Sequence, residues 1–258
     1  MSAGDFGGLD ARPPIGLEDL NSAAALQTRM DRKYVVGARH AAGILRAFTA
    51  DVRVLEMLGR RSFAYDSVYF DTPSLDSYLL AAHGRRRRYK VRTRTYVDSG
   101  TSFLEVKTEG ARAATVKERI PYDPGDSHRL TSEGLAYIRE TLACSIGSVP
   151  SGALGPVIGT RYRRITLYLP DSGSRATIDL GVTWRTPGGR SHQLDGAVIV
   201  ETKSGNSAGA LDRHLWASGV RPTRISKFAT GMAALDPALP ANRWHRTLST
   251  SLPLRPLS

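Results

Sequence analysis

The chain of 258 residues is poor in cysteine and has no long apolar run. Its single cysteine, Cys144, excludes an internal disulfide and a zinc site built on several cysteines, and a reducing cytoplasm suits such a chain. No run approaches the roughly 18 apolar residues of a membrane-spanning helix, and the first residues lack the order of a signal peptide. We therefore expect a cytoplasmic protein with no membrane segment of its own, which leaves room for a separate membrane partner.

Two common kinds of catalytic site are also missing. The chain has no Gly-x-x-x-x-Gly-Lys-[Ser/Thr] sequence, so a P-loop does not hold phosphate here. The six histidines are spread along the chain without the spacing of metal ligands. Any phosphate chemistry must depend on other side chains.

Positive charge is abundant, but lysine is scarce. The formal net charge is +12 and the pI is near 10.2, which indicates a polyanionic partner: nucleic acid, an anionic membrane surface, or a phosphate-rich molecule or polymer. Only six of the 36 basic residues are lysines, and five of these lie in short motifs that read as strands or turns. Lysine offers phosphate a compact point charge, whereas arginine offers a planar fork.

A nucleic-acid binder is the more distant alternative. The pI and the run Arg85–Arg88 favour it, although such a run is typical of an electrostatic patch. Only 7% of the residues are aromatic, and Tyr89, Tyr96 and Tyr162 do not form the pattern of a base-stacking platform. We therefore expect no nucleic-acid partner.

Hydrophobic periodicity predicts one mostly β domain. We expect a flexible leader over 1–20, a single domain over 21–236 and a flexible tail over 237–258. Helices are predicted over 38–50, 128–144, 208–218 and 226–235. Strands are predicted over 33–36, 52–55, 64–70, 86–96, 102–108, 115–120, 160–169, 176–180 and 197–203.

Alternation along these strands sorts the charges onto one face, because residues two apart point to the same side. Lys90, Arg92 and Arg94 share a face, as do Glu105 and Lys107. Residues of the other face, such as Val91, Leu104 and Val106, are apolar. A simple sandwich would expose the charged face to water. Like charges on neighbouring strands repel, however, so we favour a barrel whose apolar face is covered by helices and whose charged face lines a tunnel.

Several short motifs carry a family resemblance. Asp31-Arg32-Lys33-Tyr34 (within 28–34), Tyr69-Phe70-Asp71-Thr72 (within 67–73), Tyr89-Lys90-Val91-Arg92, Leu104-Glu105-Val106-Lys107 and Ser226-Lys227-Phe228 occur in this order. Together they resemble the VTC domain, the polyphosphate polymerase domain of the triphosphate tunnel metalloenzymes. The resemblance implies an α+β fold, an eight-stranded antiparallel β-barrel tunnel with flanking helices.

The resemblance also implies a site. Its catalytic residues would be Arg92, Arg94, Lys107 and Lys117. Substrate would be bound by Lys33, Arg164, Arg175, Lys203, Ser226 and Lys227. Glu201, aided by Glu105, would hold Mn²⁺ or Mg²⁺. The register at Arg161, Arg163 and Arg164 stays open, and Lys90 is expected near a tunnel mouth, with a small contribution.

The implied activity is transfer of the γ-phosphoryl group of ATP to phosphate or inorganic polyphosphate. A tunnel-type triphosphatase and a protein that only binds polyphosphate remain alternatives. A polymerase and a hydrolase differ mainly in whether phosphate or water reaches the in-line position.

Overall fold

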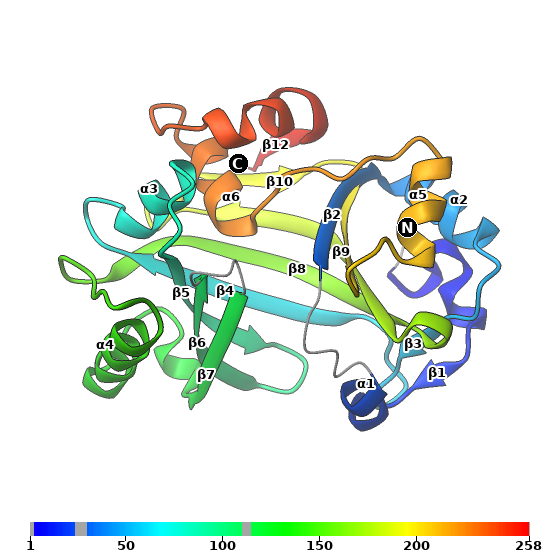
Figure 1. Cartoon of the computed structure of the whole chain (residues 1–258), viewed down its shortest axis with the longest axis horizontal. Helices are drawn as coiled ribbons and strands as arrows, with labels where there is room; N and C mark the ends of the chain where they lie inside the picture. The colour runs from blue at the N-terminus through cyan, green and yellow to red at the C-terminus, as the bar shows by residue number, and fades with distance from the viewer. Residues whose placement is uncertain (1–2, 24–29, 110–114, 258) are drawn as a thin grey trace.

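The computed structural model describes residues 3–23, 30–109 and 115–257 (Figure 1). Residues 28 and 29, where the first family motif begins, therefore lie outside the described part, as do residues 1, 2 and 258 of the predicted leader and tail. The described strands form one twelve-stranded sheet. None of the described helices has the length and apolarity needed to cross a membrane.

Eight of these strands form a continuous curled path in which each neighbouring pair is antiparallel. In spatial order they are β2 (Met30–Gly37), β11 (Ala197–Ser204), β9 (Ser174–Arg185), β8 (Gly155–Leu169), β4 (Phe63–Asp71), β5 (Arg88–Tyr96), β6 (Thr101–Glu109) and β7 (Thr115–Tyr122). The strands at the two ends, β2 and β7, do not pair with each other within the described residues. The predicted eight-stranded antiparallel, tunnel-like fold is thus confirmed, as a curled sheet without strict closure.

Four short strands extend this path: β1 (Pro14–Ile15), β3 (Arg53–Leu55), β10 (Ser191–Leu194) and β12 (Leu254–Leu257). Strand β9 bends at Gly181, where φ is +59°, a value that glycine adopts without steric cost. Its first half pairs with β11, and its last residues pair with β10. Strand β9 therefore joins two parts of the sheet: β11 and β2 beside its first half, and β10 and β12 beside its last residues.

The helices are α1 (Leu17–Ala23), α2 (Ala38–Ala47), α3 (Asp76–Ala82), α4 (Ser132–Ile146), α5 (Ala210–Ala217) and α6 (Lys227–Leu235). Their ends follow local chemistry. The Thr131 hydroxyl accepts a hydrogen bond from Gly134 N at the start of α4 (3.1 Å), and Gly147 ends that helix with φ of +62°. In Figure 1, α4 lies beside β5–β7, whereas α2 and α5 lie together beside β2 and β9.

The apolar face of the curled sheet, here called the outer face, is the one that these helices cover. Leu104 and Val106 of β6 pack in one cluster with Ile138 and Leu142 of α4. A second cluster joins β2, β8, β9 and β11 to α2 and α5. The residues between the apolar ones, such as Glu105, therefore point to the opposite, inner face. This confirms the predicted sorting of apolar and charged residues.

Helix α6 covers part of the inner face. Phe228 and Ala229 of α6 are buried in a cluster with Trp184 and Ile158. Gly231 makes this close approach possible, because a side chain there would collide with Trp184 and Ile158. The inner face is therefore apolar under α6 and charged beyond its N-terminus.

Both chain ends differ from the predicted flexible segments. In the leader, residues 3–11 form a 3-10 helix whose Phe6 and Leu9 are buried against α2. In the tail, Trp244 and Leu252 are buried, and β12 pairs with β10. Composition suggested flexibility because proline and serine are frequent there, but these few large apolar side chains are sufficient to attach both ends to the core. Helix α3 and strands β1, β10 and β12 were also not predicted.

Candidate functional site

Three lysines form a row across neighbouring strands of the inner face. Strand pairing places Lys90 of β5 directly opposite Lys107 of β6, and Lys107 directly opposite Lys117 of β7. Like charges in directly opposite positions repel and destabilise a sheet. A row of this kind is favourable once a polyanion lies along it.

Lys107, in the middle of the row, has no hydrogen-bond or ion-pair partner among the described residues. Burial, together with the nearby charges of Arg92 and Arg94, holds the pKa of Lys107 well below its usual value. Lys90 has one neutral partner, since its ammonium donates to Ser226 Oγ (3.1 Å). Burial and the charges of neighbouring cations lower the pKa of Lys90 to about 8.

Glu105 supports the arginine beside this row. It lies opposite Arg92, accepts a hydrogen bond from Arg92 Nε (2.8 Å), and contacts Lys117 Nζ at 3.3 Å. Burial alone would raise the pKa of Glu105, but Arg92, Arg94 and Lys117 hold it well below its ordinary value. Both carboxylate oxygens are therefore occupied. These contacts do not fit the metal-ligand role expected for Glu105, but they suit a residue that positions Arg92.

Two buried tyrosines orient the arginines of β5. Arg92 donates to the Tyr69 hydroxyl (3.1 Å), and Arg94 donates to the Tyr162 hydroxyl (2.9 Å) and to Ser67 Oγ (3.2 Å). Arg92 and Arg94 are each only 8% exposed, although Arg94 contacts no carboxylate among the described residues. A buried guanidinium without a carboxylate is costly unless another anion approaches it.

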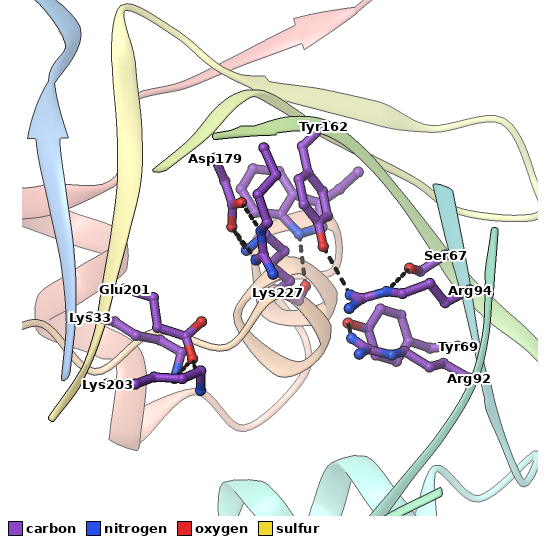
Figure 2. A network of polar contacts seen from close by, with 12 residues as sticks. Lys33, Ser67, Tyr69, Arg92, Arg94, Tyr162, Asp179, Glu201, Lys203 and Lys227 are labelled. Atoms are coloured by element: carbon purple, nitrogen blue, oxygen red, sulfur yellow. Dashed lines mark hydrogen bonds and ion pairs between the residues drawn. The ribbon is translucent and has the colours of Figure 1, made fainter. Parts of the chain in front are cut away.

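A second charged group faces these arginines across the inner face (Figure 2). Lys203 Nζ lies between Glu201 Oε1 (2.8 Å) and Asp31 Oδ2 (2.7 Å), and Lys33 Nζ lies 3.6 Å from Glu201 Oε1. Burial alone would raise the pKa of Glu201, but Lys33, Lys203 and Arg164 hold it well below its ordinary value. Glu201 is thus ionised and surrounded by cations.

A third group joins the sheet to α6. Arg164 of β8 makes two hydrogen bonds to Asp179 of β9, at 2.6 and 2.9 Å, and Lys227 of α6 also bonds to Asp179. The Lys227 ammonium stacks over the ring of Tyr162 at 4.6 Å. The neighbouring Ser226 caps α6 by accepting from Ala229 N (3.3 Å). The start of α6 is thus fixed beside Arg94 and Lys90.

The inner face carries far more positive than negative charge. Arg175, in register with Lys203, adds a further guanidinium, one of whose nitrogens donates to the Leu20 carbonyl (3.2 Å). The cations and carboxylates of these groups number ten and four, a formal excess of six positive charges. The cations are Lys33, Lys90, Arg92, Arg94, Lys107, Lys117, Arg164, Arg175, Lys203 and Lys227. The carboxylates are Asp31, Glu105, Asp179 and Glu201.

Metal binding by protein ligands alone does not suit this site. Among the described residues, no group of three or more His, Cys, Asp or Glu side chains could hold an ion. Glu201 and Asp31 nevertheless converge on one cationic group, the Lys203 ammonium. Mg²⁺ is commonly held by one or two carboxylates together with substrate phosphates, so Glu201 fits a metal that arrives with phosphate ligands.

The structure answers the open question of register in β8. Tyr162 and Arg164 point to the inner face, whereas Arg161 and Arg163 are exposed and Arg163 bonds to Ser62. Alternation is unbroken along β8. The irregular pairing comes from an extra residue in β9 near Gly181, because Arg161 pairs with Thr183 whereas Arg163 pairs with Leu180.

Strand pairing places Lys90 level with Lys107, so the expected difference between these two lysines in their distance from the tunnel mouth is not found. Sequence reasoning also missed Asp179 as a partner of Arg164 and Lys227, and the tyrosines that orient Arg92 and Arg94. Alternation places Asp179 on the same face as Arg175, a signal that was available. No comparable signal pointed to Tyr69, whose hydroxyl position depends on three-dimensional packing.

Comparisons with known proteins agree with this arrangement at the level of family. The VTC domain model matches residues 28–236. Among curated proteins, none matches the chain.

Solved structures that are similar to the chain include three at low identity. A Bacillus halodurans protein described as a candidate adenylate cyclase is 12% identical over 77% of this chain and 94% of that one, with a TM-score of 0.49. A Hippeastrum protein, described as a candidate adenylyl cyclase with a dominant triphosphatase activity, is 15% identical over 80% and 96% (TM-score 0.46). The PH1819 protein of Pyrococcus horikoshii is 12% identical over 78% and 97% (TM-score 0.44). Identities this low carry no information about substrate.

Proposed function

The chain belongs to the VTC domain family, and we propose that it transfers the γ-phosphoryl group of ATP to phosphate or polyphosphate on the inner face of the curled sheet. The observation that carries this proposal is the row Lys90–Lys107–Lys117, in which three ammonium groups face the same space and the central one has no partner within the described residues. A linear polyanion satisfies such a row, because its charges repeat along one direction. The single Cys144 supports a cytoplasmic location.

The charged groups have distinct roles in this proposal. Phosphoryl transfer depends mainly on positioning and on stabilising charge at the transferred group. Arg92 and Arg94 would bind the transferred phosphoryl group together with Lys107 and Lys117, because they are held in place by Glu105, Ser67 and the tyrosine hydroxyls. Lys33, Arg164, Arg175, Lys203, Ser226 and Lys227 would hold the remaining phosphates.

The state of the carboxylates favours phosphate as the acceptor over water. Glu105, Asp179 and Glu201 are each engaged by at least two cations, and the pKa of each carboxyl is lowered by these charges against the effect of burial. A carboxylate with a lowered pKa is a poor general base, so none of these three is suited to activate water. Phosphate and polyphosphate are already ionised and need no base.

A divalent ion, Mn²⁺ or Mg²⁺, would be held by Glu201 and would supply charge neutralisation at the phosphate oxygens. The protein's own contribution is to keep Glu201 ionised through Lys33 and Lys203, and to orient the arginines opposite it.

A tunnel-type triphosphatase is the second candidate. The pKa of Lys90, lowered to about 8, leaves a fraction of neutral amine near pH 8 that can accept a proton from water. The Hippeastrum protein is described as having triphosphatase activity. Triphosphate hydrolysis and polyphosphate synthesis would use the same contacts between protein and phosphate. A protein that only binds polyphosphate is the third candidate.

One experiment separates these functions. The purified protein is incubated with ATP and Mn²⁺, and the products are resolved on a polyacrylamide gel and assayed for ADP and free phosphate. A ladder of polyphosphate with matching ADP supports the polymerase. Equal amounts of ADP and free phosphate without a ladder would identify the triphosphatase, and tight tripolyphosphate binding without ADP would identify a binding protein.

A further inference from the structure

Four consecutive arginines, Arg85–Arg88, lead directly into β5, and the proposed site does not use them. Arg85, Arg86 and Arg87 are exposed, and none of their side chains has a partner among the described residues. Arg88 is half-buried, donates to the Arg85 carbonyl (2.8 Å) and forms an ion pair with Glu109. The side chains of 85–87 are therefore available to a ligand.

Arg88 joins this run to the inner face. It is the first residue of β5 and lies two residues before Lys90, so the two side chains point to the same side. Lys90 in turn donates to Ser226, two residues after the exposed Arg224. Arg88, which is paired with Glu109, and the exposed Arg224 thus lie between the lysine row and the start of β5.

A further arginine from the C-terminal segment joins the group. Arg243 donates to the Ala81 carbonyl (3.1 Å), and its guanidinium lies so close to Gly84 that a Cβ there would be 2.8 Å away. Burial lowers the pKa of Arg243 most, and the nearby positive charges of Arg88 and Arg224 lower it further. The negative charge of Glu109 acts in the opposite direction. Arg88 and Arg224 thus both lie close enough to Arg243 to repel it, and Glu109, the ion-pair partner of Arg88, partly offsets this repulsion.

We propose that Arg85, Arg86 and Arg87, together with Arg224 and Arg243, form a second phosphate-binding surface that holds the part of a long polyphosphate chain extending beyond the lysine row. This proposal, which rests on the proposed function, makes the protein selective for chain length. A triphosphate occupies the inner face alone, whereas a long chain also contacts the surface arginines. Four of these five arginines are exposed, so they add affinity through charge and counterion release and not through base recognition.

The test compares two triple variants that remove the same charge. One is Arg85→Ala/Arg86→Ala/Arg87→Ala. The control is Arg39→Ala/Arg46→Ala/Arg53→Ala, whose residues are exposed on α2 and β3, and have no side-chain partner among the described residues. Affinities for tripolyphosphate and for long-chain polyphosphate are measured by calorimetry between about 50 and 200 mM salt.

We expect the 85–87 variant to bind long-chain polyphosphate roughly tenfold more weakly and tripolyphosphate with unchanged affinity. Its plot of log affinity against log salt for the long chain should be shallower by about 2, as for the loss of three phosphate contacts at roughly 0.7 each. Equal losses for both ligands, or an equal loss in the control variant, would overturn the proposal. The proposal would also be overturned if duplex DNA displaced long-chain polyphosphate as effectively as polyphosphate of the same total charge does. That result would identify a nucleic-acid surface.

The outcome is separable from that of the proposed function. Long-chain selectivity is read from the ratio of two binding constants and needs no turnover. If the wild-type protein produces no polyphosphate, the polymerase is refuted. If the 85–87 variant nevertheless loses the preference for the long chain that the wild-type protein shows, the surface is retained. A polymerase whose product length and long-chain affinity are unchanged by the variant would refute the surface and retain the enzyme.

Discussion

Lys90→Met should stabilise the ligand-free protein and weaken phosphate binding at the same time. The ammonium of Lys90 is half-buried, lies in a row with two other lysines, and has only the Ser226 hydroxyl as a partner. Its pKa falls from 10.5 to about 8 on folding. This fall in pKa corresponds to about 3 kcal/mol, from which the lost hydrogen bond to Ser226 subtracts about 1 kcal/mol. We therefore expect a gain of about 2 kcal/mol at pH 7.

The pH dependence gives this prediction a definite sign. Because the folded-state pKa lies below that of the unfolded chain, the unfolded state binds the proton more tightly between pH 8 and pH 10.5. The penalty on the wild-type protein is therefore complete below about pH 8 and disappears as the pH rises to about 10.5. Urea unfolding of both proteins across this range should show stability curves that cross, with the variant about 1 kcal/mol less stable at high pH, where only the lost Ser226 hydrogen bond remains.

A phosphate ligand should act against this difference. A charge-assisted contact contributes about 1.5–3 kcal/mol, so Lys90→Met should bind tripolyphosphate roughly ten- to a hundredfold more weakly. At saturating tripolyphosphate and pH 7, the wild-type protein should gain more stability than the variant.

Lys203→Met is the matched control, because Lys203 is a lysine of the same face with acidic partners. Burial tends to lower the pKa of Lys203, but Glu201 and Asp31 raise it above its usual value. The control should therefore destabilise the ligand-free protein at pH 7, by about 1–3 kcal/mol. If Lys90→Met also proved destabilising at pH 7, or if its effect did not change between pH 8 and pH 10.5, the inference that Lys90 is a buried cation without an acidic partner would be refuted.

Three further variants test other parts of the site. Glu201→Gln should abolish metal-dependent turnover while tripolyphosphate still binds without metal, as measured by a Mn²⁺ titration of activity; an unchanged metal requirement would remove Glu201 from the metal site. Arg164→Ala should weaken tripolyphosphate binding at least tenfold, whereas Arg161→Ala on the exposed side of the same strand should leave it unchanged in calorimetry. Glu105→Gln leaves Arg92 without its carboxylate and should cost about 3–5 kcal/mol at pH 7. Because the pKa of Glu105 is lowered in the folded protein, this cost should shrink as the pH falls below about 4.5, and a cost independent of pH would contradict the assignment.

Much of the β architecture could be predicted from the sequence because alternation is a local property. In β6, apolar Leu104 and Val106 alternate with charged Glu105 and Lys107. This alternation is sufficient to assign one face of the strand to the core and the other to the charged surface. The family motifs then predicted the number of strands, and the structure confirms the path. The register at Arg161, Arg163 and Arg164 stayed open because three nearby arginines fitted one motif position. Alternation with Ile165 and Leu167 puts Arg164 on the charged face, and the structure agrees.

The sequence by itself determined that this protein carries a large excess of positive charge, that many of its strands have one charged and one apolar face, and that the lysines of these strands lie on the charged face. Only the tertiary structure decided which of these cations have partners. Lys203 lies between two carboxylates, whereas Lys107 lies between two lysines, although each follows a glutamate by two residues. The reason is that register between strands sets the neighbours of a side chain, and register depends on turns, bulges and packing over the whole sheet. Residues far apart in the chain, such as Asp31 and Lys203, therefore meet only when the sheet is complete.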